Sequence, residues 1–120
     1  MKYLKLKKRG SFYDPEDCSS VDMDNLGSFL TSDKYFAKCW LSNPDLYDGG
    51  NVTFTDEKNG NILIMNLYTE DEDEAYRNAF IISKDELINF LKKLNELYKL
   101  DPAEIIITYD NDKLTLESKD

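Results

Sequence analysis

The residues best suited to binding chemistry are five consecutive carboxylates in the second half of this 120-residue chain. They run from Glu70 through Asp71, Glu72 and Asp73 to Glu74, with Tyr68 and Tyr76 on either side. Like charges this close repel one another, so a purely structural turn gains nothing from them. Such a run is typical either of a solvated turn or of a segment that binds a cationic partner. We predict the second, with the two tyrosines as aromatic anchors.

A second acidic cluster lies near the N-terminus. Its members are Asp14, Glu16, Asp17, Asp22 and Asp24, and Tyr13 stands beside them. Carboxylates next to an aromatic side chain are typical of a surface that fits a cationic groove on another protein. We therefore predict that this cluster, with Tyr13 as a further anchor, belongs to the same partner-binding surface.

The spacing of acids after Asp22 also resembles half of an EF-hand calcium loop. Asp22 and Asp24 take the first and third positions, and Gly27 takes the sixth. Leu26, at the fifth position, offers no side-chain oxygen, and no helix is expected to enter the loop. We expect no metal site and no cofactor.

Enzyme chemistry finds little support because the chain contains no histidine. That excludes Ser-His-Asp and Cys-His machinery, an imidazole base near neutral pH, and zinc sites that use histidine. The sequence also has no Gly-rich phosphate loop, no Gly-x-Ser-x-Gly elbow and no Cys-x-x-Cys pair. We predict that the protein is not an enzyme.

The charge balance indicates the kind of partner. Lys and Arg number 15 against 24 Asp and Glu, a formal net charge of −9. Residues 1–9 hold five bases and no acids, so residues 10–120 carry ten bases against 24 acids, or −14. Such a field repels nucleic acid and accelerates encounter with a positive surface. The charges therefore predict a basic protein partner and no direct nucleic-acid binding.

These residues must be positioned by the elements that the hydrophobic pattern predicts. Residues 2–8 alternate as a strand, and the lysines on its solvent face suit an edge position. Residues 10–20 have the composition of a loop, and residues 21–32 that of a short helix. Residues 35–41 fit either a helix or a strand.

The second half predicts its elements more sharply. Strands at 52–55 and 62–68 flank the turn pair Asn59-Gly60, and a further strand at 76–82 follows the acidic run. Ser83 stands three residues before Glu86, a capping-box spacing that predicts the start of a long apolar-striped helix. Residues 104–109 and 113–117 predict a hairpin.

The order of these elements predicts the α+β class in one domain covering residues 1–120. We expect a mainly antiparallel sheet of about five to six strands, with one long helix from the C-terminal half packed on one face. No apolar stretch approaches the ~20 residues needed to span a bilayer, and the basic start lacks the apolar core of a signal peptide. We expect a cytoplasmic protein with no membrane contact, in which Cys18 and Cys39 are free thiols.

Size, acidity, α+β plan and missing catalytic residues together resemble the small acidic immunity proteins of bacterial contact-dependent growth inhibition and polymorphic toxin systems. The resemblance implies a bacterial inhibitor that binds a cognate toxin domain tightly and blocks its active site. Many such toxins are basic nucleases, so carboxylates filling the nucleic-acid cleft would be a direct mechanism. Two alternatives stay open: an acidic nucleic-acid mimic that blocks a nucleic-acid-binding protein, and a non-catalytic accessory domain. The oligomeric state is open as well.

Overall fold

The computed structural model describes residues 1–31, 53–55, 59–65 and 71–120. Three expectations fall outside these ranges: the element at 35–41, the free thiol of Cys39, and the positions of Tyr68 and Glu70. No helix within the described ranges is both long and apolar enough to cross a membrane.

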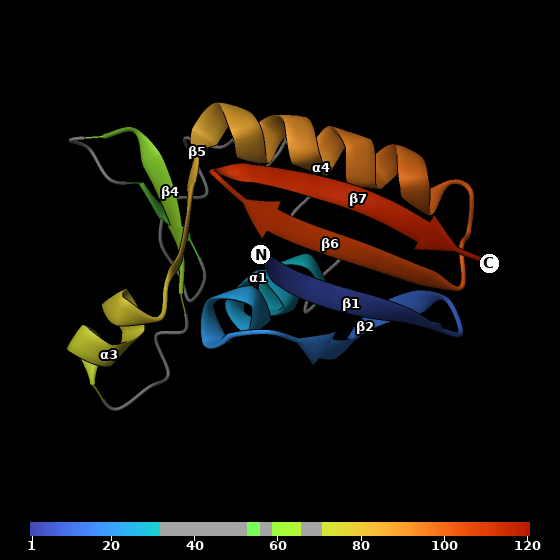
Figure 1. The fold of residues 1–120 in the computed structure, drawn as a ribbon, viewed down its shortest axis with the longest axis horizontal. Helices are drawn as coiled ribbons and strands as arrows, with labels where there is room; N and C mark the ends of the chain where they lie inside the picture. The colour runs from blue at the N-terminus through green and yellow to red at the C-terminus, as the bar shows by residue number, and fades with distance from the viewer. Residues whose placement is uncertain (32–52, 56–58, 66–70) are drawn as a thin grey trace.

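The described residues form seven strands and three helices (Figure 1). In chain order they are β1 (Lys2–Arg9), β2 (Phe12–Cys18), α1 (Val21–Thr31), β3 (Thr53–Thr55), β4 (Asn61–Ile64), α3 (Glu72–Arg77), β5 (Phe80–Ser83), α4 (Lys84–Tyr98), β6 (Glu104–Asp110) and β7 (Lys113–Lys119).

The strands belong to two antiparallel sheets. The main sheet has the order β2-β1-β6-β7, and the small sheet has the order β3-β4-β5. This confirms the predicted α+β class with antiparallel pairing and one long helix, α4. The expected single sheet is instead divided in two, because β4 pairs with β3 and β5, and none of these three strands pairs with the main sheet.

The position of β1 differs from the prediction. It lies inside the main sheet, between β2 and β6, and not at an edge. Lysines suit an edge strand because they discourage its pairing with another chain, but they are equally stable inside a sheet when both neighbouring strands supply carboxylates, as here. Lys5 lies 3.8 Å from Glu16 on β2 and 3.4 Å from Glu104 on β6.

The loop expected at residues 10–20 is also wrong, because most of it is strand β2. Gly10 turns the chain with a φ of 67°, a conformation that suits glycine, and β2 then pairs back along β1. Pro15 lies opposite Leu6, next to a shift in register between Lys5 and Leu6. A proline is tolerated there because β2 is an outer strand, where a missing N–H costs no ladder hydrogen bond.

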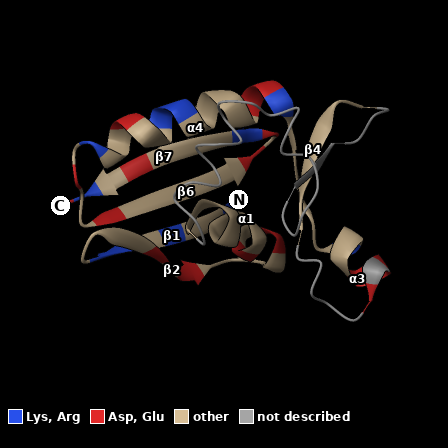
Figure 2. Ribbon diagram, turned by 180° about the vertical axis from the view of Figure 1, so that it is seen from behind, with Lys and Arg blue, Asp and Glu red and all other residues tan. Residues whose placement is uncertain are grey.

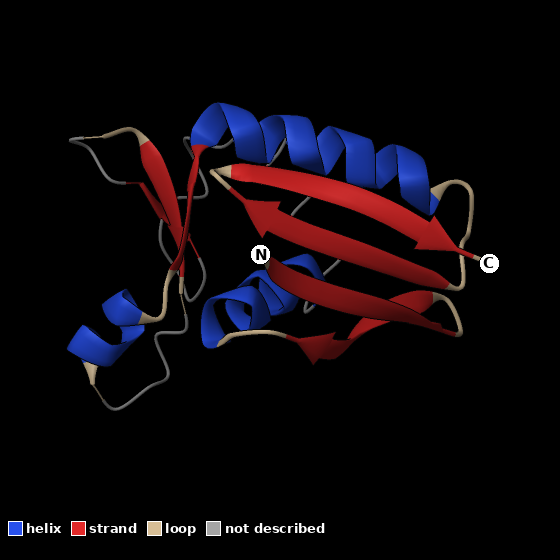
Figure 3. Cartoon of the chain, in the orientation of Figure 1, coloured by secondary structure: helices blue, strands red, loops and turns tan. Residues whose placement is uncertain are grey.

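One hydrophobic core joins the two sheets. Helices α1 and α4 cover one face of the main sheet, and no described helix crosses its other face (Figures 1 and 3). Alternate residues of β1 and β6 point to the covered face, so Leu4, Leu6, Ile105 and Ile107 are fully buried. The same cluster takes in side chains of both helices and of the small sheet, among them Met23, Leu26, Phe29, Ile62, Ile64, Phe80, Ile82, Leu87, Phe90, Leu91 and Leu94.

Helix α4 begins as the capping-box spacing predicts. The Ser83 hydroxyl accepts a hydrogen bond from the backbone N–H of Glu86 at 3.4 Å. The carboxylate of Glu86 accepts a hydrogen bond from the backbone N–H of Leu114 on β7, at 3.3 Å. The start of the helix is thereby joined to the outer strand of the main sheet.

The predicted hairpins are confirmed in the described residues. β6 and β7 are joined by Asn111 and Asp112, with φ values of 50° and 60°. Two successive residues with positive φ are characteristic of the tight type I′ turn, whose twist matches that of antiparallel strands. Gly60, with a φ of 69°, precedes β4 in the other hairpin.

Candidate partner-binding surface

The acidic run begins a short helix, which the sequence did not predict. The expected strand at 76–82 is wrong over its first part, because α3 extends to Arg77 and only Phe80–Ser83 form β5. Asp71 is the N-cap of α3, and its carboxylate accepts a hydrogen bond from the N–H of Asp73 at 2.9 Å. Acids in the first turn are favourable because they lie at the positive end of the helix dipole. The mutual repulsion of these acids is therefore partly offset by the helix that they start.

The described charged side chains of α3 face solvent. Asp73 and Glu74 are exposed, and Tyr76 in the next turn is 58% exposed. Arg77 reaches back to Asp71, with 4.0 Å between nitrogen and oxygen, and so neutralises the N-cap. Among the described side chains of α3, Asp73 and Glu74 are thus the acids that no described cation compensates, and they lie on the same short helix as the exposed ring of Tyr76.

Two contacts hold α3 in place. Ala75 is buried in a small cluster with Met65 and Ala79. The side-chain amide of Asn25, which is buried on α1, donates a hydrogen bond of 2.8 Å to the backbone carbonyl of Asn78 at the end of α3. The helix is therefore attached both to the small sheet and to α1.

The five acids of the second cluster lie on two different elements, and only one of these elements contacts the end of α3. Asp22 and Asp24 lie in the first turn of α1, alongside the end of α3. Asp14, Glu16 and Asp17 lie on β2, at the outer side of the main sheet and away from α3 (Figures 1 and 2). The hydrogen bond of Asn25 thus places the first turn of α1 on the side of the molecule where α3 ends, whereas the acids of β2 lie apart from α3.

The acids of β2 are engaged by the basic strand β1. Asp14 lies 3.3 Å from Arg9, and Glu16 lies 3.8 Å from Lys5. Asp17 accepts a hydrogen bond of 2.9 Å from the Tyr3 hydroxyl, and this bond, followed by the charge of Asp17, raises the pKa of Tyr3. The charges of Asp14 and Glu16 are therefore compensated within the fold, and Asp17 is held by a neutral hydrogen-bond donor.

Two further bases of β1 are used in the same way, whereas Lys7 is exposed and forms no ion pair within the described residues. Lys2 forms an ion pair with Asp22, and Lys8 lies 2.6 Å from Asp101. Burial by itself raises the pKa of the Asp22 carboxyl. Hydrogen bonds from Lys2 and Ser20, together with the charge of Lys2, lower this pKa by more than burial raises it, so the pKa of Asp22 lies below its usual range. Figure 2 shows the basic residues of β1 beside β2, which carries acidic residues. The other four acids of the second cluster each form an ion pair or a side-chain hydrogen bond with a residue of β1. Among the described acids of this cluster, only Asp24 is exposed and forms neither.

Tyr13 belongs to the core and not to the exposed surface. Its side chain is 9% exposed, its ring stacks on Tyr98, and its hydroxyl donates a hydrogen bond of 2.5 Å to the carbonyl of Pro102. It is not available as an anchor, because alternation along β2 turns it toward the covered face of the main sheet.

One exposed apolar residue near α3 was not predicted. Ile81 on β5 is 47% exposed, between the buried Phe80 and Ile82. The inside-outside alternation of residues 80–82 is the signal that could have identified it. Ile81 lies on the strand that follows α3, five residues after the exposed Tyr76.

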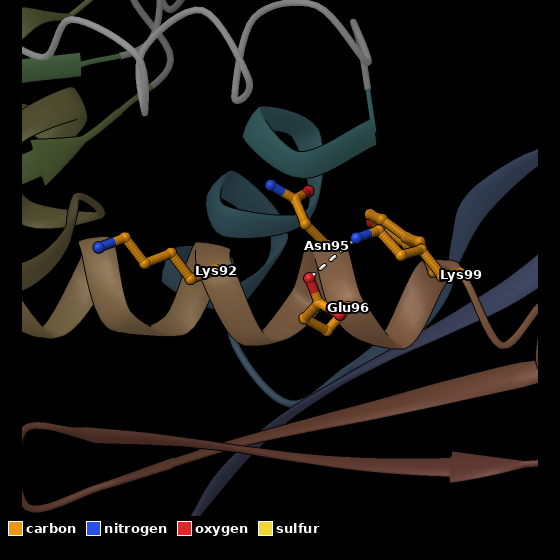
Figure 4. A pocket seen from close by; sticks show the side chains of 5 residues that line it. Lys92, Asn95, Glu96 and Lys99 are labelled. Atoms are coloured by element: carbon orange, nitrogen blue, oxygen red, sulfur yellow. Dashed lines mark hydrogen bonds and ion pairs between the residues drawn. The ribbon is translucent and has the colours of Figure 1, made fainter.

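The exposed side of α4 carries two shallow hollows. One, of about 460 Å³, is lined by Lys92, Asn95, Glu96, Tyr98 and Lys99 (Figure 4). Lys99 donates a hydrogen bond of 2.9 Å to Glu96 across it. The other lies between α4 and β7, and Glu96 borders both.

Neither metal-binding nor thiol chemistry stands out in the described residues. They contain no group of three or more Cys, Asp or Glu side chains that could hold a metal ion. Cys18 is a free, half-buried thiol, and burial, followed by the charge of Asp24, raises its pKa. A raised pKa disfavours the reactive thiolate.

Comparisons of the chain with protein-family models, with curated protein sequences and with solved structures found no significant match.

Proposed function

We propose that this protein is a non-catalytic inhibitor that binds a basic partner protein through α3 and the first turn of α1. The partner class that we propose is a toxin domain, as for bacterial immunity proteins. The observation that carries the proposal is that Asp73 and Glu74 are exposed near Tyr76 with no ion pair to any described residue, whereas the acids of β2 are paired with β1.

The physical basis is an electrostatic encounter followed by aromatic docking. Carboxylates on one exposed surface raise the rate at which a cationic partner arrives. Tyr76 and Ile81 supply the apolar area that stabilises the complex once formed, since aromatic side chains are enriched among the residues that dominate interface energies. Asp24 adds a carboxylate at the α1 side of this surface.

The test begins by isolating the partner from the native cells with the tagged full-length protein. The captured basic protein is then expressed alone and together with this chain. We expect the partner alone to stop growth and co-expression to restore it. A partner that binds nucleic acid but is harmless on expression would instead support the nucleic-acid-mimic function.

The surface is tested by substitution in the same complex. Asp73→Asn with Glu74→Gln should slow association by about fivefold at low salt and flatten its dependence on ionic strength. Tyr76→Ala should mainly accelerate dissociation. The matched control is Asp110→Asn with Glu117→Gln, which removes the same charge from exposed positions on β6 and β7. Equal effects of the two double variants would exclude α3 from the interface.

A further inference from the structure

A groove runs between the outer strand β7 and the C-terminal half of α4. It has a volume of about 550 Å³, and four leucines supply its apolar lining: Leu97, Leu100, Leu114 and Leu116. Leu100 is 74% exposed, although it directly follows the last turn of α4. The groove lies at the opposite end of the molecule from α3 (Figure 1).

One wall of the groove is the edge of β7. Thr115 borders the groove, yet its hydroxyl is hydrogen-bonded to that of Thr108 on β6, on the uncovered face of the main sheet. The strand edge itself therefore contributes to the wall. β7 pairs with β6 alone among the described strands, so the backbone on its other side is unpaired there.

The Glu86 contact shows which backbone groups point outward. The N–H of Leu114 points away from β6, because it donates to the carboxylate of Glu86. Backbone groups alternate in direction along a strand, so those of Leu116 and Ser118 point outward as well. Glu86 closes the edge at Leu114 and leaves it open from Leu116 onward, beside the apolar groove. An open edge of this kind is a template for an added strand.

The charges of the groove indicate what the added strand carries. Glu96 is bound to Lys99 on the same helix, at 2.9 Å. Lys93, the other charged residue of the lining, is exposed and forms no ion pair within the described residues. The groove therefore presents one uncompensated positive charge on its helical wall.

We propose that this groove binds an extended segment of another protein, which adds to β7 as an antiparallel fifth strand of the main sheet. Its backbone pairs with Leu116 and Ser118. Its alternate side chains point toward α4, apolar ones against Leu97 and Leu100 and one carboxylate at Lys93. This mode of recognition takes affinity from main-chain hydrogen bonds and specificity from alternate side chains. The site uses no residue of α3 and goes beyond the proposed function.

The experiment uses the full chain and the synthetic peptide acetyl-Thr-Val-Thr-Ile-Thr-Asp-Thr-amide, whose order places Asp at the Lys93 end of the groove when it runs antiparallel to β7. In an antiparallel pair its Asp, Ile and Val face α4, and the N–H groups of the same residues face β7. Amide exchange followed by NMR should show the Leu116 and Ser118 amides unprotected in the free protein. Saturating peptide should slow their exchange by about tenfold or more, while Thr115 and Glu117, already bonded to β6, change little.

Matched peptides and variants separate strand addition from mere apolar contact. N-methylation of the peptide at Ile should abolish binding, and N-methylation at the following Thr should leave it within about twofold. Lys93→Glu should weaken binding by about fivefold or more, whereas Lys92→Glu, an equally exposed lysine outside this groove, should change it by less than about twofold.

Three results would overturn the proposal. The first is no protection of Leu116 and Ser118 at millimolar peptide. The second is protection of these amides in the free protein, which would mean that this chain or a second copy already covers the edge of β7. Protection by a second copy would decrease on dilution, and protection by the same chain would not. The third is equal binding of the two N-methylated peptides, which would leave apolar contact without strand addition.

Discussion

The ring of Tyr13 stacks on the ring of Tyr98, with centroids 5.2 Å apart and planes inclined by 29°. The pair joins β2, the outer strand of the main sheet, to the last turn of α4. The pKa of Tyr98 is raised from 10.0 to about 12, mainly by burial and secondly by the charge of Tyr13. The strand that carries part of the second acidic cluster is thereby joined to the core by an aromatic contact, in addition to the ion pairs that its acids form with β1.

The ionisation of Tyr98 makes the folded state sensitive to alkali. Because its pKa is raised on folding, its contribution to stability is fully present below pH 10 and is lost as pH rises toward 12. Between pH 9 and pH 11 the wild type should lose about 1 kcal/mol more of its free energy of unfolding than Tyr98→Phe does. Urea titrations at the two pH values measure this difference.

Phenolate absorbance provides the control for that prediction. Tyr98→Phe should remove the last step of the tyrosine titration, and Tyr76→Phe, at an exposed position, should retain it. A last step that survives in Tyr98→Phe would contradict the assignment.

The ion pair between Lys2 and Asp22 should produce the opposite pH dependence. The pKa of Asp22 is lowered below 3.8 in the folded protein, so its contribution is present above that pH and is lost as pH falls. We expect Asp22→Asn to be less stable than the wild type at pH 7, and the two to converge in acid. Thermal unfolding at neutral and acid pH tests this, with Asp24→Asn as the control for net charge. A difference that persists unchanged in acid would show that the carboxylate charge is not its origin.

Gly27 lets α1 approach the main sheet closely. A Cβ at this position would lie 3.1 Å from Leu4 Cδ1 and 3.3 Å from Pro15 Cγ. Gly27→Ala should be nearly neutral, because the gain in helix propensity of about 1 kcal/mol offsets this tight contact. Gly27→Val should lower the free energy of unfolding by about 1–3 kcal/mol, since its branches have no space. Urea denaturation of both variants tests the contact, and equal stabilities would argue against it.

Asn25 should control the attachment of α3. Asn25→Ala leaves the carbonyl of Asn78 without its donor and should cost about 1–2 kcal/mol. Amide exchange should become faster in α3, and affinity for the basic partner should fall although net charge is unchanged. Asn89→Ala, at an exposed position on α4, is the control. Unaltered exchange in α3 would indicate that the packing of Ala75 is sufficient to hold the helix.

The elements that were predicted correctly are those whose signals are local. Ser83 and Glu86 define the start of α4 within one turn, and the leucines that follow repeat at the helical period. Asn111 and Asp112 provide the turn of the last hairpin within two residues. Local preferences are sufficient here because each of these features is formed by neighbours in the chain.

The elements that were missed depend on distant partners. β2 contains a proline and several acids, and it is a strand because β1 supplies its hydrogen bonds and cations. Helix α3 was not predicted because the β-forming residues of β5 follow it directly and favour a strand. The end of α3 is supported by a distant residue, Asn25 on α1. In both cases tertiary contacts override the local composition.

By itself the sequence determined the α+β class, the helix α4, the two hairpins, the lack of histidine and the acidic balance. Only the tertiary structure decided which acids remain available. The strand order places β1 between β2 and β6, so its bases meet carboxylates from both sides, while Asp73 and Glu74 face solvent. The physical reason is range: turns, caps and periodicity act within a few residues, whereas ion pairing and exposure depend on which segments the fold brings together.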